Sequence, residues 1–218
     1  MPGLSNLLNA AADLLLGARC PGCSAPGWGV CASCSRSLRT TTACRILLDG
    51  LPVVASCPYR PLLEHVIPRY KDDGALHLER FLAGLLADAV ALCQPPRDAL
   101  LVPVPSLGRA VRQRGFDHGR RLAARTGRLQ GNSTRAVLRR RPAGTDQAGL
   151  GRVARQLNLR GSMWAPTMSG PVLILDDVAT TGASIAEARR ALTAAGATVI
   201  GAAVIAHVDN LGRAGPKG

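Results

Sequence analysis

The chain of 218 residues has few aromatic side chains and few lysines. Aromatic residues make up only 3% of it, so its core must be built from leucine, valine, isoleucine and alanine. Lys71 and Lys217 are the only lysines, and arginine supplies nearly all of the positive charge. No apolar run reaches the roughly 18 residues that a membrane-spanning helix needs. The N-terminal stretch lacks the basic start of a secretory signal and contains Asp13, so we expect a cytoplasmic protein.

Acidic residues are also scarce, and the formal net charge is +13. The segment from Arg97 to Arg160 holds fifteen arginines and only three aspartates, and a field of that size attracts polyanions. Grooves for single-stranded nucleic acid combine basic residues with aromatic ones, and Phe116 is the only aromatic residue in this segment. The segment therefore indicates a small-anion site first and a nucleic-acid surface second.

Strand-like and helix-like patterns alternate along most of the chain. A short helical or irregular piece is expected around Pro61 and Pro68. Alternation of this kind is typical of an α/β fold with a parallel sheet, whose ligands bind beyond the carboxyl ends of the strands. The patterns predict strands at 52–56, 99–105, 172–178 and 198–208, and helices at 76–93, 107–128 and 185–195.

The most informative segment is VLILDDVATTGAS at 172–184. An apolar strand ends in Asp176 and Asp177, a small polar turn follows, and a helix then begins. The free N–H groups at a helix start bind phosphate, and Gly182 allows a close approach of the backbone. The two carboxylates, expected at the solvent end of the strand, can accept hydrogen bonds from a vicinal diol. The segment therefore predicts a sugar-phosphate site made by the two acids and by Ala179, Thr180, Thr181, Gly182, Ala183 and Ser184.

Four of the seven cysteines form two Cys-x-x-Cys pairs near the N-terminus. Two such pairs joined by a short loop supply four thiolates to one tetrahedral metal, most simply zinc. Disulfides and an iron–sulfur cluster are the alternatives, and the expected compartment argues against disulfides. The predicted metal ligands are Cys20, Cys23, Cys31 and Cys34, whereas Cys44, Cys57 and Cys93 are expected to be core thiols.

The acid pair followed by Thr-Thr-Gly resembles the phosphoribosyl-pyrophosphate (PRPP) signature of type I phosphoribosyltransferases. With the cysteine pairs, Tyr70-Lys71, the Val-Pro-Val-Pro segment at 102–105 and Arg-Gly-Phe at 114–116, the chain resembles the ComF family over about residues 14–208. A spaced set between these motifs contributes Thr145, Gln147, Leu150, Arg155 and Asn158. The resemblance implies a type I phosphoribosyltransferase fold behind a zinc ribbon. It also implies PRPP and pyrophosphate as ligands, and single-stranded DNA and a competence helicase as candidate partners in DNA uptake.

The resemblance also assigns roles to individual residues. Asp176 and Asp177 would hold the ribose hydroxyls, directly or through the metal shell, and the 179–184 turn would bind the 5′-phosphate. Residues 139–160 correspond to a flap that covers the site, and magnesium would arrive with PRPP because it prefers substrate phosphates. The remaining phosphate contacts would come from the pyrophosphate loop Val104, Pro105, Ser106 and Leu107, from Lys71 and Arg114, and from Arg152 or Arg155 of the flap.

The chain departs from the family pattern at Asp117-His118, where Asn-Gln is usual. His118 could act on an acceptor, but we expect a surface or core histidine. No pocket for a nucleobase can be identified in the sequence. Three functions therefore stay open: a phosphoribosyltransferase with an unknown acceptor, a non-catalytic PRPP-binding regulator, and a DNA-uptake accessory protein. The expected domains are 1–45 (a helix over Leu4–Leu16 and the zinc ribbon), 46–210 (the phosphoribosyltransferase-like domain) and 211–218 (a flexible tail).

Overall fold

The computed structural model of the chain describes residues 18–141 and 160–208. The predicted α/β class is confirmed, because five strands form one sheet in the order β1-β2-β7-β6-β3 and only the β1–β2 pair is antiparallel. A separate two-stranded hairpin pairs β4 with β5. The strands are β1 (Cys44–Leu48), β2 (Leu51–Pro58), β3 (Leu100–Pro103), β4 (Arg139–Arg140), β5 (Met163–Trp164), β6 (Pro171–Ala179) and β7 (Thr198–His207).

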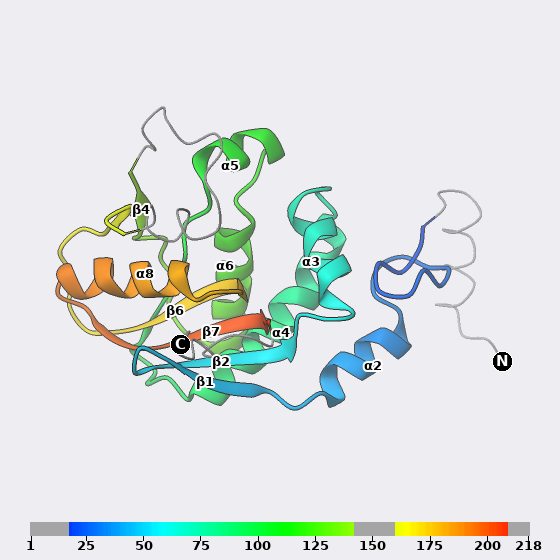
Figure 1. The fold of residues 1–218 in the computed structure, drawn as a ribbon, viewed down its shortest axis with the longest axis horizontal. Coiled ribbons are helices and arrows are strands. Elements are labelled where there is room, and N and C mark those ends of the chain that lie inside the picture. The colour runs from blue at the N-terminus through cyan, green and yellow to red at the C-terminus, as the bar shows by residue number, and fades with distance from the viewer. Residues whose placement is uncertain (1–17, 142–159, 209–218) are drawn as a thin grey trace, which may run out of the picture.

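Helices cover both faces of the large sheet (Figure 1). α8 packs on one face, while α4 and α6 pack together on the other. α2 and the cysteine-bearing head lie at one end of the molecule, next to α3 (Figure 1). The helices are α2 (Ala32–Thr40), α3 (Leu63–Lys71), η1 (Leu76–Leu78), α4 (Glu79–Cys93), α5 (Gly108–Arg114), α6 (His118–Gln130) and α8 (Ala183–Ala194).

The central strand β6 shows why this sequence forms a buried strand. Side chains alternate between the two faces of a strand, so Val172 and Ile174 pack under α8 whereas Leu173 and Leu175 pack toward α4 and α6. Because both faces are covered, the strand is apolar without interruption until Asp176. The first polar side chains of β6 therefore occur at its carboxyl end.

The predicted helix at 107–128 is wrong, because the structure divides it into α5 and α6. Gly115 ends α5 with φ of 78°, a left-handed conformation that glycine adopts at low cost. Asp117 then caps α6, since its side chain accepts a hydrogen bond from the backbone N–H of Arg120. The break places His118 at the first turn of α6.

Four further elements, α2, β1, β4 and β5, were not predicted. β1 is an edge strand in which alternate residues are exposed, and the β4–β5 hairpin contributes only two residues per strand. The predicted helix at 76–93 is confirmed as η1 and α4. Among residues 18–141 and 160–208, no helix is both long enough and apolar enough to span a membrane. The predicted N-terminal helix, most of the predicted flap and the predicted tail lie outside the described residues.

Candidate functional site

Two loops meet at the carboxyl ends of β3 and β6. The strands are parallel neighbours, with Pro103 opposite Leu175, and the backbone N–H of Val104 donates to the carbonyl of Leu175 at 2.8 Å. The segment Val104–Leu107 therefore begins beside the acid pair at 176–177. These are the predicted pyrophosphate loop and the predicted ribose-binding acids, so the sheet brings together two segments about 70 residues apart in the sequence.

Asp177 points inward and is fully engaged. Its Oδ2 lies 2.8 Å from Lys71 Nζ, at the end of α3, and 3.2 Å from His118 Nε2, at the start of α6. Only 8% of Asp177 is exposed, so the expectation that both acids lie at the solvent end of the strand is wrong for this residue. Burial acts to raise the pKa of Asp177, but the hydrogen bond from His118 and the charge of Lys71 outweigh it and lower that pKa. Asp177 is therefore an ionised anchor for α3 and α6.

Asp176 differs from its neighbour because no cation pairs with it among the described residues. Its side chain is half-buried, and Oδ1 accepts a hydrogen bond from the backbone N–H of Asp177 at 2.9 Å. Burial and the charge of Asp177 raise the pKa of Asp176 to about 7. This carboxylate is thus the one of the pair that can still accept hydrogen bonds from a ligand.

The turn after β6 has the features of an anion cradle. Gly182 occupies the N-cap of α8 and has no side chain to bond the first amides of the helix, while Thr180 and Thr181 are exposed. Ala179 is buried, and Ala183 and Ser184 are half-buried at the helix start. The N-terminus of this twelve-residue helix is directed at the same strand ends as the acids.

Gly182 also lies close to another part of the chain. Its φ is 75°, and a Cβ there would lie 2.5 Å from Leu48 Cδ2, at the end of β1. The left-handed backbone favours glycine here, and a side chain at 182 would also have to displace the flexible end of Leu48. A larger residue at 182 would disturb the turn before any phosphate reached it.

Arg114 and His118 are linked at the mouth of the site. Arg114 Nη2 lies 2.8 Å from Asp72 Oδ1, and its Nη1 lies 3.2 Å from His118 Nδ1. Ser106 donates to Asp117 Oδ1 at 2.9 Å. His118 is buried within this cluster, whereas the sequence favoured a surface or core histidine over a residue that acts on an acceptor. The available signal was the Asp117-His118 departure from the family pattern.

Some of the remaining basic residues stabilise the fold through ion pairs. Arg121 and Arg125 both pair with the buried Glu79, so they fasten α6 to α4. Tyr70, beside Lys71, also reaches Glu79 with its hydroxyl, at 3.4 Å. Part of the basic segment thus stabilises the fold. Arg152 and Arg155, predicted to reach the pyrophosphate, lie outside the described residues.

The four predicted metal ligands lie together in the head. The Sγ atoms of Cys20, Cys23, Cys31 and Cys34 are all within 4.8 Å of one another. Metal–sulfur bonds of about 2.3 Å in a tetrahedron place the sulfurs about 3.8 Å apart, so the cluster fits one ion. Backbone N–H groups donate to two of the sulfurs, at 3.3 Å to Cys20 and 3.4 Å to Cys31. The cluster can therefore hold a structural metal.

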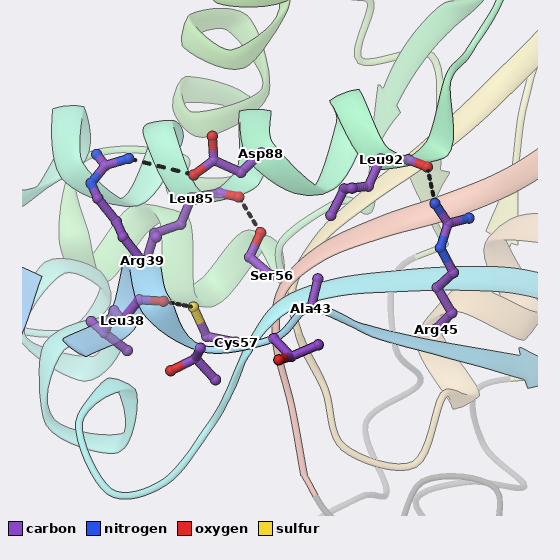
Figure 2. A pocket seen from close by; sticks show the side chains of 11 residues that line it. Leu38, Arg39, Ala43, Arg45, Ser56, Cys57, Leu85, Asp88 and Leu92 are labelled. Carbon is purple, nitrogen blue, oxygen red and sulfur yellow. Dashed lines mark hydrogen bonds and ion pairs between the residues drawn. The ribbon is translucent and has the colours of Figure 1, made fainter. Parts of the chain in front are cut away.

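Away from this site, a hollow of about 560 Å³ lies between the end of α2, β1, β2 and α4 (Figure 2). Arg39 pairs with Asp88 at 3.6 Å, and Arg45 donates to the carbonyl of Leu92 at 2.7 Å. Ser56 and Cys57 likewise donate to backbone carbonyls. The polar side chains labelled in Figure 2 therefore all have protein partners, and none of them calls for a ligand.

Comparison with solved structures finds low similarity to several proteins. An allosteric regulatory enzyme of purine biosynthesis is 17% identical over 60% of this chain, at a TM-score of 0.40, and the match spans 26% of that enzyme. Orotate phosphoribosyltransferase from Aeropyrum pernix is 18% identical (80% of this chain, 92% of that one, TM-score 0.36). An adenine phosphoribosyltransferase is 15% identical (81% and 91%, TM-score 0.37). No protein-family model and no curated protein matches the chain. A likeness at this level establishes no shared activity.

Proposed function

We propose that the chain binds PRPP with magnesium and transfers its ribose 5-phosphate to an acceptor, as a type I phosphoribosyltransferase related to the ComF family. The observation that carries the proposal is the junction of β3 and β6, where the 104–107 loop, Asp176 and the N-terminus of α8 meet. These three features offer a pyrophosphate loop, an acceptor for ribose hydroxyls and a phosphate cradle. PRPP carries the three matching groups, a pyrophosphate, ribose hydroxyls and a 5′-phosphate, on one small molecule.

The proposed binding mode follows from which groups still lack a partner. The first amides of α8 would receive the 5′-phosphate, because Gly182 has no side chain to cap them and the only side-chain acceptor there among the described residues is the Thr181 hydroxyl, 3.4 Å from the backbone N of Ala183. Asp176 would accept hydrogen bonds from the ribose, since its carboxylate is not paired with a cation among the described residues. Magnesium bound with PRPP would neutralise part of the pyrophosphate charge.

The proposed transfer is a displacement at C1′ of the ribose. The lone pair of the acceptor forms the new bond to C1′, the bond to the pyrophosphate oxygen breaks, and pyrophosphate leaves with that electron pair. The acceptor nitrogen or oxygen loses its proton to solvent water or to the departing pyrophosphate. Asp177, Lys71 and His118 would hold α3 and α6 in place around the reacting groups rather than bind the ribose, because Lys71 Nζ and His118 Nε2 both contact Asp177 Oδ2.

Pyrophosphate release in the presence of magnesium, PRPP and a panel of nucleobases and amines tests the catalytic part of this proposal. Release that depends on one acceptor class would identify the substrate. Saturable PRPP binding with no release across the panel would instead identify a PRPP-binding regulator. The variant Asp176→Asn is the control, since it should suppress any release that arises at this site.

The affinity for PRPP should rise with pH because Asp176 must be ionised to accept hydrogen bonds. With its pKa near 7, the ionised fraction grows about tenfold between pH 6 and pH 8, and so should affinity. The phosphates of PRPP also titrate near pH 6 and add their own pH dependence. The comparison must therefore be made against Asp176→Asn, whose affinity should keep only the pH dependence that comes from the ligand. Calorimetric titrations at several pH values measure the difference. Parallel profiles for the two proteins would show that Asp176 does not bind the ligand.

We also propose that the metal of the head is zinc and that its role is structural. The head contacts the body through close packing: a Cβ on Gly22 would lie 3.1 Å from Leu62 Cδ2, and the Trp28 and His77 rings are 4.7 Å apart. A segment this short buries too little apolar surface to fold alone, so a metal would fix the geometry of its loop.

A further inference from the structure

The β4–β5 hairpin places one arginine of the Arg-Arg-Arg run at 139–141 against the predicted pyrophosphate loop. Arg140 lies opposite the buried Met163, whereas Arg139 lies opposite the exposed Trp164. Side chains alternate along a strand, so Arg140 faces inward while Arg139 and Arg141 face outward and are exposed. The Nε of Arg140 donates to the carbonyl of Pro105 at 2.8 Å. This bond fixes the guanidinium beside the 104–107 loop.

Arg140 differs from Lys71 and Arg114 at the strand ends because it has no ion pair within residues 18–141 and 160–208. Lys71 pairs with Asp177 and Arg114 pairs with Asp72, but no carboxylate of the described residues pairs with Arg140. Burial lowers the pKa of Arg140, and the nearby charges of Asp176 and Glu187 only partly offset that effect. Glu187 is itself held by Arg190 at 2.8 Å. A partly desolvated cation without a counter-ion is costly, which favours an anionic ligand at this position.

The geometry of the guanidinium specifies the kind of anion. With Nε bound to Pro105, the two terminal nitrogens stay available as a planar fork, and such a fork matches two oxygens of a phosphoryl group. Asp176 acts on Arg140 electrostatically without pairing with it, so a ligand that carries both an anionic phosphoryl group and hydroxyls could satisfy both residues.

We propose that Arg140 binds the pyrophosphate group of PRPP by a two-pronged hydrogen bond from its terminal nitrogens, next to the 104–107 loop. This inference rests on the proposed function, because it assigns a residue to the same site. It also separates Arg140 from Arg139 and Arg141, which the sequence presents as one basic cluster.

Calorimetric titration with inorganic pyrophosphate and MgCl₂, repeated with PRPP, tests this inference. Arg140→Ala should weaken pyrophosphate binding at least tenfold, since a hydrogen bond to a charged group is worth about 1.5–3 kcal/mol. Arg139→Ala is the control, because it removes the same charge one residue away and should change the affinity less than about twofold. The pyrophosphate affinity of Arg140→Lys should lie between those of the wild type and Arg140→Ala, because lysine keeps the charge but has no planar fork of two nitrogens. If Arg140→Ala does not fold, Arg140→Gln is measured instead, since glutamine keeps a donor for the carbonyl of Pro105 without the charge. It should show the same loss of pyrophosphate affinity.

The outcomes distinguish this inference from the proposed function. Wild-type affinity in Arg140→Ala, or equal losses in Arg139→Ala and Arg140→Ala, would overturn the role of Arg140 and leave PRPP binding intact. Pyrophosphate binding that depends on Arg140 in a protein that does not bind PRPP would overturn the proposed function and leave Arg140 as an anion site.

Discussion

The variant Cys31→Ser should lose its metal and much of the structure of the head. Structural zinc in small modules contributes on the order of 10 kcal/mol to their folding, which is more than any other single change in this chain should remove. Cys31 is also the N-cap of α2, where its Sγ accepts a hydrogen bond from the backbone N–H of Cys34. Serine is a good N-cap, so the substitution keeps the cap and removes the thiolate.

Elemental analysis should find one zinc per chain in the wild type and almost none in Cys31→Ser. Cys44→Ser is the matched control, because Cys44 lies on β1, outside the four-cysteine cluster, and should keep a full complement of metal. Full metal content in Cys31→Ser would remove the assignment of these four ligands. Loosening of the head should also reach α3, because Gly22 lies close to Leu62, at the start of that helix.

The two adjacent acids should respond differently to the same substitution. Asp176→Asn should weaken PRPP binding tenfold or more, since a hydrogen bond to a charged group is worth about 1.5–3 kcal/mol and 1.4 kcal/mol is a factor of ten. It should not reduce stability at pH 8. The raised pKa of Asp176 means that the fold disfavours its ionised form, so replacing it relieves that cost above pH 7.

Asp177→Asn should instead lower the free energy of unfolding, because it leaves Lys71 without its carboxylate. The loss should be below the roughly 3–5 kcal/mol of a fully buried pair, since 31% of the Lys71 side chain still reaches solvent. Denaturant unfolding and PRPP titration of both variants separate the two roles, with Asp88→Asn as a control on an exposed acid. Normal PRPP affinity in Asp176→Asn, together with a stable but non-binding Asp177→Asn, would reverse the assignment.

The main strands and the meeting of the two loops could be predicted from the sequence because local patterns carry that information. The apolar run before Asp176 specifies a buried strand, and parallel neighbours place their carboxyl ends together. The break between α5 and α6 was also present in the sequence, as Gly115 followed by the capping residue Asp117, but the basic pattern on either side obscured it.

The partners of individual side chains could not be predicted in the same way. Nothing local distinguishes Asp176 from Asp177, and their difference arises because Lys71 and His118 approach from α3 and α6. Likewise, Arg139 and Arg140 are equivalent in sequence until the two-residue strand β4 turns one inward and the other outward. Gly182 suited a phosphate turn, yet its tight neighbour is Leu48, about 130 residues earlier.

Titration calorimetry of the zinc-loaded wild type with PRPP and MgCl₂ tests the central claim most directly. We expect saturable binding of one PRPP per chain at submillimolar concentration, weakened at least tenfold in Asp176→Asn. A wild-type protein that retains its zinc and its melting transition but binds no PRPP at millimolar concentration would contradict it.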